Sequence, residues 1–308
     1  MDRKDVIILG GGPAGLTAGI YASRELLKTL LIEKQATGGL PATTDLIENY
    51  PGFPDGINGI ELMRLMRTQA QKFGTEIQEY EEVKSIIPQG RKIIVKTNKE
   101  QYEALSVIIA TGSVPKPLNI HGEREFTGRG VSYCATCDGP LYRNKKVAIV
   151  GGGNAAAEEA LFLSKFAQEV ILVHRRSELR ATEILQKRLH GKEKIKFLLN
   201  HNLISINGND MVTSITVKDR ESGEEKEVKV SGVFVYVGLL PNSNFVKGVV
   251  ELDEKGYIVT NAKMETSVPG IFAVGDIRSN QVRQISTACG NAVTAVINAE
   301  HYIREIRE

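Results

Sequence analysis

The chain has 308 residues, of which 42% are hydrophobic and 25% are charged. This composition is ordinary for a globular protein of one or two domains, and it excludes a disordered or fibrous chain. The 39 Lys and Arg residues are interspersed with 37 Asp and Glu residues, giving a formal net charge of +2. Because no block of one sign stands out, nothing favours nucleic acid or an anionic membrane as a partner.

The N-terminus gives no sign of export. A few charged residues lead directly into the apolar run Val6–Leu9 and a glycine turn, without the apolar core and cleavage pattern of a signal peptide. No apolar run approaches the roughly 20 residues that span a bilayer. We therefore expect a cytoplasmic protein, in a reducing environment where structural disulfides are rare.

Two stretches repeat one pattern of apolar strand, glycine turn and helix. The first covers residues 6–25 with the turn Gly10-Gly11-Gly12-Pro13-Ala14-Gly15, and the second covers 147–165 with the turn Gly151-Gly152-Gly153-Asn154-Ala155-Ala156. In this pattern the first glycine permits a tight turn and the second lets the backbone approach a pyrophosphate. The third small residue lets the helix pack on the strand. One such motif is weak, but two in the right context predict two nucleotide-binding domains.

Each repeat is followed by a meander of alternating residues, at Val83–Ile109 and at Ile204–Val237. Prolines 115 and 117 follow the first meander, and Gly238–Asn242 follows the second. Both segments are typical of short links between domains.

The remaining segment, Phe245–Glu308, contains a strand pattern at Gly270–Val274 and a helical pattern from about Ser286 to Arg304. It is too short to form a hydrophobic core of its own. We expect it to dock on one of the two copies.

The residue about 20 positions beyond each turn distinguishes the two nucleotides, because it lies beside the adenosine ribose. In the first copy this residue is Glu33, whose carboxylate accepts from ribose hydroxyls and repels a 2′-phosphate, so FAD or NAD is favoured. In the second copy it is the run His174-Arg175-Arg176, with Arg180 about one helical turn further on. Guanidinium groups pair with phosphate bidentately, which favours NADPH over NADH. The alternatives are a solvated basic turn and an ordinary surface glutamate.

Two cysteines lie two residues apart, as Cys134-Ala135-Thr136-Cys137, followed by Asp138. A zinc site is disfavoured because Cys289 is the sole other cysteine and no paired histidine spacing occurs, so we expect no metal. An inert disulfide is disfavoured in a reducing compartment. Next to a nucleotide loop, the pair is best interpreted as a redox-active disulfide. We expect Cys289 itself to be a small buried residue.

Taken together, these motifs resemble the low-molecular-weight thioredoxin reductases over nearly the full chain. The matching segments are Gly10-Gly11-Gly12-Pro13-Ala14-Gly15, Glu48-Asn49-Tyr50-Pro51-Gly52, Ala110-Thr111-Gly112, Cys134-Ala135-Thr136-Cys137-Asp138-Gly139, Gly151 to Ala156, His174-Arg175-Arg176 and Phe272-Ala273-Val274-Gly275-Asp276.

The resemblance implies an α/β fold with two Rossmann-like, three-layer nucleotide-binding domains, each with a β-meander, the second inserted in the first. Residues 1–116 and 245–308 would form the FAD domain, and residues 117–244 the NADPH domain that carries the CxxC. A homodimer is also implied. Since the nicotinamide and the CxxC would then share one domain, we expect a rotation about the two links.

The resemblance further implies a set of contact residues for each cofactor. The FAD contacts would be Gly10, Gly12, Pro13, Ala14, Gly15, Glu33, Lys34, Gly38, Gly39, Leu40, Asn49, Val83, Ala110, Thr111, Gly112, Gly275, Asp276, Arg283, Gln284 and Ile285. The NADPH contacts would be Gly151, Gly153, Asn154, Ala155, Ala156, His174, Arg175, Arg176 and Arg180.

For the reaction, the resemblance implies that electrons pass from NADPH through FAD to the Cys134–Cys137 disulfide and on to thioredoxin or a thioredoxin-like protein. Cys137 would face the flavin, Cys134 would attack the protein substrate, and Asp138 would be the general acid. Asp138 also suits a turn before Gly139-Pro140.

Two departures from the family pattern concern the flavin. Leu40-Pro41 stands where the family usually has Gln-Leu, and Ala288-Cys289-Gly290-Asn291-Ala292 replaces a more usual Ala-Ala-Gly-Asp-Gly run. Because Leu40 replaces the glutamine, we expect one amide contact to FAD to be lost, and from both departures we expect an unusual flavin affinity or potential.

Other functions that a protein of this fold could have stay open. They are an enzyme that uses reduced ferredoxin or a deazaflavin as electron donor, a ferredoxin–NADP reductase, and a reductase for a glutaredoxin-like protein or a peroxidase module. A redox sensor without catalysis is the alternative from another class. The intact Arg175 and Arg176 favour NADPH, and the CxxC is not needed by a ferredoxin–NADP reductase.

Overall fold

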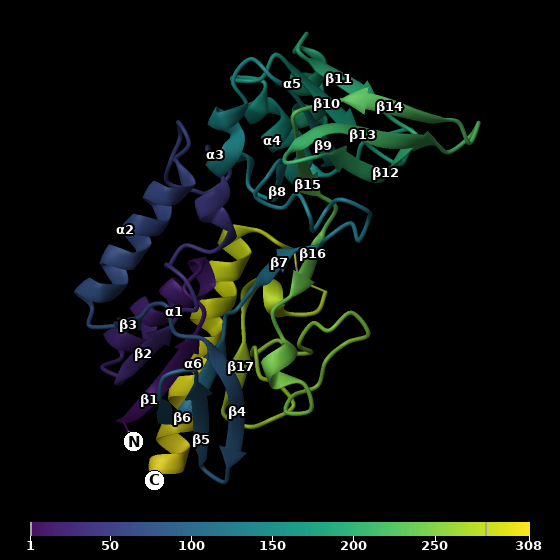
Figure 1. Ribbon diagram of the computed structural model, residues 1–308. Coiled ribbons are helices and arrows are strands. Elements are labelled where there is room, and N and C mark those ends of the chain that lie inside the picture. The colour runs from purple at the N-terminus through teal and green to yellow at the C-terminus, as the bar shows by residue number, and fades with distance from the viewer. Residues whose placement is uncertain (1, 281) are drawn as a thin grey trace. The chain divides into compact units, whose positions relative to one another are not determined.

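The computed structural model describes residues 2–280 and 282–308 (Figure 1). It divides the chain into two compact units, Met1–Val114 with Leu240–Glu308 as unit 1, and Pro115–Leu239 as unit 2. At both points where the chain passes from one unit to the other, the domain limit expected from the sequence lies a few residues further along the chain. The two crossing segments are themselves short strands, β7 (Ser113–Pro115) and β16 (Leu239–Pro241), which pair with each other.

Unit 1 is built around a seven-stranded sheet in the order β3-β2-β1-β6-β5-β4, with β17 pairing β6. Its elements are β1 (Asp2–Leu9), α1 (Pro13–Arg24), β2 (Thr29–Ile32), a 3-10 helix (Leu40–Thr43), α2 (Gly59–Lys72), β3 (Glu76–Gln78), β4 (Val83–Gln89), β5 (Lys92–Thr97), β6 (Gln101–Ile109), a 3-10 helix (Asn244–Val246), β17 (Ile271–Ala273), a 3-10 helix (Gly275–Ile277) and α6 (Ile285–Arg307).

Alternating side chains of the central strands divide the core of unit 1 into two clusters. Ile8 pairs in parallel with Leu31 on β2 and with Ile108 on β6, and all three lie in the cluster that α1, α2 and α6 cover. Their neighbours Ile7 and Leu9 point to the opposite face, where the meander and the segment around Val246 cover them. Because strands buried on both faces need apolar residues throughout, β1 contains the continuous run that the sequence shows.

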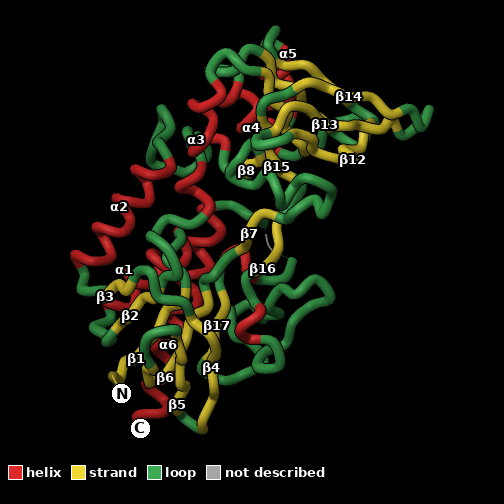
Figure 2. The backbone as a smooth tube through the Cα atoms, viewed as in Figure 1, coloured by secondary structure: helices red, strands yellow, loops and turns green. Residues whose placement is uncertain are grey.

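Unit 2 repeats this plan with a five-stranded parallel sheet in the order β11-β10-β9-β15-β8 and a separate antiparallel sheet β12-β13-β14. Its elements are β8 (Val131–Ser132), α3 (Ala135–Asp138), a 3-10 helix (Gly139–Tyr142), β9 (Lys146–Gly151), α4 (Asn154–Leu163), β10 (Glu169–Val173), α5 (Glu183–His190), β11 (Ile195–Leu198), β12 (His201–Gly208), β13 (Val212–Asp219), β14 (Glu225–Lys229) and β15 (Gly232–Tyr236). Helices cover one face of the parallel sheet and the meander covers the other, so both units have three layers. Figure 2 distinguishes their helices, strands and loops by colour.

The C-terminal segment belongs to unit 1. Strand β17 pairs in parallel with β6, with Phe272 opposite Ile108. Helix α6 buries the small residues Ala292, Ala295 and Ala299 in the cluster that also holds α1, which lets the two helices approach closely. In the described part of the chain, no helix has the length and apolarity needed to cross a membrane.

Candidate functional site

The first glycine turn has the geometry that its sequence predicts. Gly10 has φ +109°, and a Cβ there would lie 2.4 Å from the Ala110 carbonyl oxygen, so a side chain is excluded on both grounds. A Cβ on Gly15 would lie 1.8 Å from the Gly10 oxygen. At Gly12, by contrast, a Cβ would meet only the Gly39 Cα, at 3.9 Å. The backbone is therefore open on the side where a pyrophosphate would approach.

The N-terminus of α1 carries no side-chain cap. The helix begins after Gly12 with Pro13 as its first residue, and Gly12 makes no capping hydrogen bond. The backbone N–H groups of a first helical turn have no partner within the helix, and they suit an anionic group. Unit 1 thus fits a dinucleotide phosphate at residues 12–15, where Pro13, Ala14 and Gly15 are buried.

Glu33 lies at the end of β2 and is bound to the glycine turn. Its Oε2 accepts from the Gly11 N–H at 2.6 Å and its Oε1 accepts from the Gln35 N–H at 2.9 Å. Each carboxylate oxygen retains a further lone pair, so the group can still accept from ribose hydroxyls. The next predicted residue, Lys34, is exposed and pairs with Glu82 at 3.1 Å.

The loop after Glu33 folds back onto the glycine turn. The Gly38 N–H donates to the Gly11 oxygen at 2.9 Å, and a Cβ on Gly39 would lie 3.2 Å from the Gly12 Cα. Leu40 then starts the 3-10 helix and is half-buried. Val83 begins β4 and packs partly buried against the meander side of the core. The structure therefore brings Glu33, Gly38 and Gly39 to the first turn, whereas Lys34 points to Glu82.

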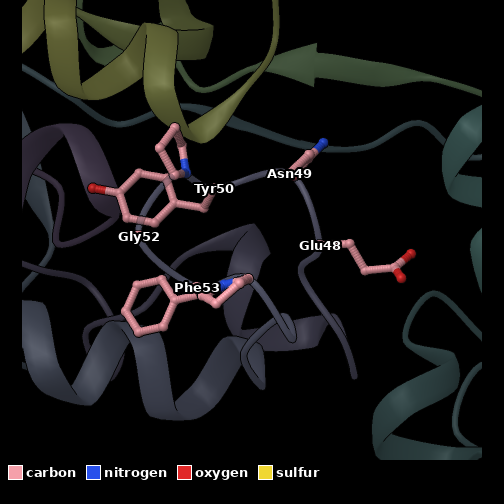
Figure 3. A pocket seen from close by; sticks show the side chains of 7 residues that line it. Glu48, Asn49, Tyr50, Gly52 and Phe53 are labelled. Atoms are coloured by element: carbon pink, nitrogen blue, oxygen red, sulfur yellow. The ribbon is translucent and has the colours of Figure 1, made fainter.

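The segment Glu48–Pro54 lines an open surface pocket of about 390 Å³ (Figure 3). The Asn49 side-chain amide donates to the Gln284 side-chain oxygen at 3.0 Å, so two predicted FAD residues from distant parts of the chain meet here. The Tyr50 ring stacks with Phe53 at 6.2 Å between centroids, and its hydroxyl lies 4.0 Å from Cys289 Sγ. Burial, followed by Cys289, raises the pKa of Tyr50 to about 12.

Cys289 is half-buried, so the prediction that it is a buried residue is wrong. It lies on α6, packed partly against the helix-covered core of unit 1 with its Sγ beside the Tyr50 hydroxyl.

Asp276 lies in the 3-10 helix that follows β17. Burial raises the pKa of its carboxyl, and the nearby Arg283 acts in the opposite direction. The preceding Gly275 approaches the first turn, since a Cβ there would lie 3.2 Å from the Ala14 Cβ. The Arg283 guanidinium lies over the Tyr257 ring at 4.7 Å. The structure thus places Gly275 next to the nucleotide turn and holds Arg283 on an aromatic ring.

Asn242 is a residue of this region that the sequence did not predict to take part. Its backbone N–H donates to the Gly112 oxygen at 3.0 Å and its side-chain amide donates to the Thr111 oxygen at 3.0 Å. The Thr111 hydroxyl donates in return to the Asn242 oxygen at 2.9 Å. The predicted run Ala110–Gly112 is therefore fixed by a residue 130 or so positions away, and no local signal announces such a pairing. Ile285, the last predicted FAD residue, is the first residue of α6.

The second glycine turn repeats the open geometry of the first. Nothing lies within 4 Å of a Cβ built on Gly153, and α4 begins after Gly153 without a side-chain cap. A Cβ on Gly151 would lie 2.8 Å from the Ala156 Cβ, so helix and strand are close. Asn154 accepts from the Thr182 N–H at 2.9 Å, and Ala155 is exposed on the first turn of α4. Unit 2 therefore also fits a nucleotide phosphate.

His174 is placed differently from the other members of its basic cluster. It is 5% exposed, and a Cβ on Gly152 would lie 2.3 Å from its ring. Burial, followed by Arg180, Arg176 and Arg175, lowers the pKa of the imidazole. Its Nε2 is buried without a hydrogen-bond partner among the described residues. His174 therefore packs against the glycine turn as a neutral ring, so the positive charge of this cluster comes from its arginines.

The three arginines around His174 are exposed. Arg180 does not continue a helix, because α5 begins only at Glu183, but its backbone N–H donates to the Gly152 oxygen at 2.6 Å. The carbonyls of Arg175 and Arg176 accept from Arg220 and Asn200. The structure thus gathers three exposed guanidinium-bearing residues within electrostatic reach of one buried imidazole beside the glycine turn.

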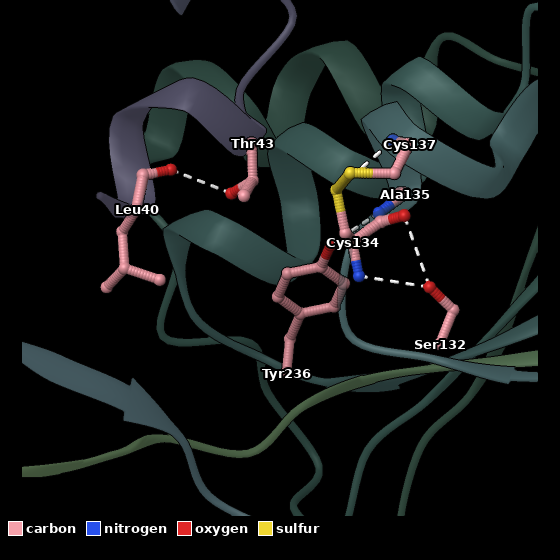
Figure 4. The surroundings of a disulfide bond; sticks show 7 residues. All are labelled: Leu40, Thr43, Ser132, Cys134, Ala135, Cys137 and Tyr236. Atoms are coloured by element: carbon pink, nitrogen blue, oxygen red, sulfur yellow. Dashed lines mark hydrogen bonds between the residues drawn. A yellow bond between two sulfur atoms is a disulfide. The ribbon is translucent and has the colours of Figure 1, made fainter. Parts of the chain in front are cut away.

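Cys134 and Cys137 form a disulfide, with 5.3 Å between their Cα atoms (Figure 4). Cys134 precedes the short helix α3, and its Sγ accepts from the Cys137 N–H at 3.1 Å. Cys134 is half-buried and Cys137 is exposed. Asp138 ends α3 and is half-buried, one residue from Cys137. Among the described residues there is no cluster of His, Cys, Asp and Glu that could hold a metal ion.

Comparison with known proteins gives consistent matches. The model of the pyridine nucleotide-disulphide oxidoreductase family matches residues 4–292. The chain is 46% identical over 305 residues to a thioredoxin reductase of Bacillus subtilis, covering 99% of this chain and 96% of the relative.

A second relative, the bifunctional thioredoxin reductase/thioredoxin of Mycobacterium leprae, is 45% identical over 98% of this chain and 66% of its own length. Among solved structures, the thioredoxin reductase of Lactococcus lactis superposes with a TM-score of 0.96 at 42% identity, covering 98% of this chain and 99% of that one. The likeness therefore extends through both units.

Proposed function

This chain belongs to the pyridine nucleotide-disulphide oxidoreductase family, and we propose that it is a thioredoxin-disulfide reductase that uses NADPH and FAD. The observation that carries the proposal is the disulfide Cys134–Cys137 in the same unit as an open, uncapped glycine turn. The names of its similar relatives support the choice of thioredoxin as substrate.

Unit 1 is assigned to FAD. The uncapped N-terminus of α1 holds the pyrophosphate, and Glu33 accepts from the adenosine ribose with the lone pairs that Gly11 and Gln35 leave. Asn49 and Gln284, joined at 3.0 Å, line the region of the ring system. Asp276 bonds the ribitol, and its raised pKa reflects a burial that such a hydrogen bond would offset.

Unit 2 is assigned to NADPH. The uncapped N-terminus of α4 faces the pyrophosphate, and Gly153 leaves the space for it. Arg175, Arg176 and Arg180 bind the 2′-phosphate as charged forks, while the neutral His174 keeps the turn in shape. When bound, the two cofactors would supply the two electrons that open the disulfide.

The chain's own sulfur chemistry then follows. Reduction of the disulfide consumes two electrons and two protons and leaves two thiols. The Cys134 thiolate attacks one sulfur of the thioredoxin disulfide and forms a mixed disulfide, and the other thioredoxin sulfur leaves as a thiolate. Cys137 then attacks Cys134 Sγ, which restores the internal disulfide and releases reduced thioredoxin. Asp138, one residue beyond Cys137, holds the proton that the departing thiolate takes up.

The wider setting follows from the same family assignment. We place the enzyme in the cytoplasm as a homodimer, with a rotation of the units about β7 and β16 between the two half-reactions. A different donor, such as ferredoxin or a deazaflavin, would leave the three arginines beside the second turn without a role. A glutaredoxin-like protein or a peroxidase module as acceptor would change only the docking partner.

Steady-state kinetics with NADPH and thioredoxin test the proposal. The purified, FAD-loaded protein should reduce thioredoxin, and Cys137→Ser should abolish this turnover while NADPH still bleaches the flavin. Cys289→Ala is the matched control and should retain turnover. Full activity of Cys137→Ser, or faster turnover with reduced ferredoxin than with NADPH, would contradict the proposal.

A further inference from the structure

Tyr236 ends strand β15 at the position that Ala110 occupies in the first copy of the repeat. In each copy the carbonyl oxygen of this residue approaches the first glycine of the turn, with 2.4 Å between Ala110 O and a Cβ built on Gly10, and 2.4 Å between Tyr236 O and one built on Gly151. Since a methyl group suffices in unit 1, the turn itself does not need an aromatic side chain. The phenol of Tyr236 must therefore be explained by something present only in unit 2.

That feature is the redox-active segment. The Ala135 N–H donates to the Tyr236 hydroxyl oxygen at 2.9 Å, as Figure 4 shows. Ala135 is 0% exposed, so this N–H has no access to water as an alternative acceptor. A buried N–H without an acceptor is destabilising, so the Tyr236 oxygen is an effective anchor for the residue that follows Cys134.

Ser132 anchors the other side of Cys134. Its hydroxyl oxygen accepts from the Cys134 N–H at 3.0 Å and its hydroxyl lies 3.2 Å from the Cys134 carbonyl oxygen, to which it donates. Ser132 and Tyr236 together hold the peptide groups on both sides of Cys134, and we call this pair the Cys134 clamp. With the backbone held, Cys134 Sγ lies 3.1 Å from the Cys137 N–H.

We propose that the Cys134 clamp positions the Cys134 sulfur for its role as attacking thiolate, with Tyr236 as a positioning residue that keeps the Cys137 N–H directed at Sγ. The proposal rests on the proposed function for the meaning of that role. A thiolate that accepts a backbone N–H is stabilised relative to the thiol, so its pKa falls. Loss of the clamp should therefore raise the pKa of the Cys134 thiol.

The Tyr236 hydroxyl can be removed without changing the charges around the redox-active segment. Burial raises the pKa of Tyr236, with smaller contributions in the same direction from Glu159 on α4 and Asp138 on α3, so the phenol is neutral at physiological pH. Tyr142, in the 3-10 helix after α3, is also within electrostatic reach of Asp138. Tyr236→Phe removes one oxygen and alters none of these charges at neutral pH.

Tyr142→Phe is the matched control. Tyr142 is buried in the same unit, and its ring packs edge-on against Phe234 at 5.3 Å. No described hydrogen bond joins its hydroxyl to residues 132–137. Both substitutions thus remove one phenolic oxygen from a tyrosine within electrostatic reach of Asp138, and only one of them touches the clamp.

The test measures the pH dependence of iodoacetamide alkylation in a Cys137→Ser, Cys289→Ala background, where Cys134 is the sole thiol of the chain's three cysteines. The backbone N–H of residue 137 is kept in this background. Adding Tyr236→Phe should move the alkylation profile to higher pH and slow the reaction about threefold to tenfold near pH 7. Adding Tyr142→Phe should leave the profile in place.

Ser132→Ala provides a second variant from the other half of the clamp, should Tyr236→Phe fail to fold, and it should shift the profile in the same direction. Profiles for the clamp variants that superimpose on the background, shift to lower pH, or shift no more than Tyr142→Phe would overturn the proposal. The measurement needs no NADPH and no thioredoxin. If the chain failed to reduce thioredoxin, the proposed function would be wrong, but the alkylation profiles would still show whether the Cys134 clamp lowers the pKa of the Cys134 thiol.

Discussion

Gly153→Ala should separate nucleotide binding from stability in unit 2. Gly153 has φ −97° and ψ −177°, an extended conformation open to alanine, and nothing lies within 4 Å of the added Cβ. The methyl group therefore meets no protein atom. Because alanine restricts the unfolded chain, stability should stay level or rise by roughly 0.4–1 kcal/mol.

The same methyl group would occupy the space that we assign to the NADPH pyrophosphate at the uncapped N-terminus of α4. We expect the KM for NADPH to rise about tenfold or more, which corresponds to roughly 1.4 kcal/mol of binding. Gly152→Ala is the contrasting variant, because its Cβ would lie 2.3 Å from the buried His174 ring. Displacing that ring should cost roughly 1–3 kcal/mol of stability.

Urea unfolding without nucleotide, together with steady-state NADPH kinetics, measures both effects. A Gly153→Ala protein destabilised by more than about 1 kcal/mol would refute the open geometry. A normal KM in a stable variant would refute the assignment of the pyrophosphate to this turn.

Three further variants probe the neighbouring contacts. Burial and three arginines lower the pKa of His174, so on acidification the unfolded chain binds a proton at this residue before the folded protein does. The free energy of unfolding should therefore be highest above about pH 6.5 and should decline below it. His174→Asn should reduce that decline, as measured by urea unfolding midpoints between pH 7.5 and 5.5. Arg175→Ala should raise the KM for NADPH about tenfold and leave that for NADH nearly unchanged; equal increases would refute a 2′-phosphate contact. Asn242→Ala, which removes the donor to the Thr111 oxygen, should lower the unfolding free energy by roughly 0.5–1.5 kcal/mol, and unchanged thermal unfolding would contradict that role.

The sequence predicts well those features that local chemistry determines. The two glycine turns, the continuous apolar runs of β1 and β9 and the first meander each follow from short-range pattern, and the structure has them where the pattern indicates. The second meander ends earlier than predicted, at Lys229, because β15 joins the parallel sheet. Family resemblance adds the nesting of one domain within the other, which α/β patterning alone does not reveal.

The features that the sequence does not predict depend on tertiary contacts. His174 belongs to a run of basic residues, and only the packing of Gly152 shows that its ring is buried and neutral. Asn242 reaches Thr111 across more than a hundred residues. Tyr236 could have been noticed by aligning the two copies of the repeat, because it aligns with Ala110. Its hydrogen-bond partner Ala135, however, is apparent only in the folded structure.

The proposed electron route can be followed by an anaerobic NADPH titration of the FAD-loaded protein, with alkylation and mass spectrometry of the products. Bleaching of the flavin should be accompanied by two new alkylated thiols per chain, at Cys134 and Cys137, which disappear again when oxidised thioredoxin is added. If the flavin is reduced while Cys134 and Cys137 remain joined, electrons do not pass from the flavin to this disulfide and the protein is not a reductase of the proposed kind.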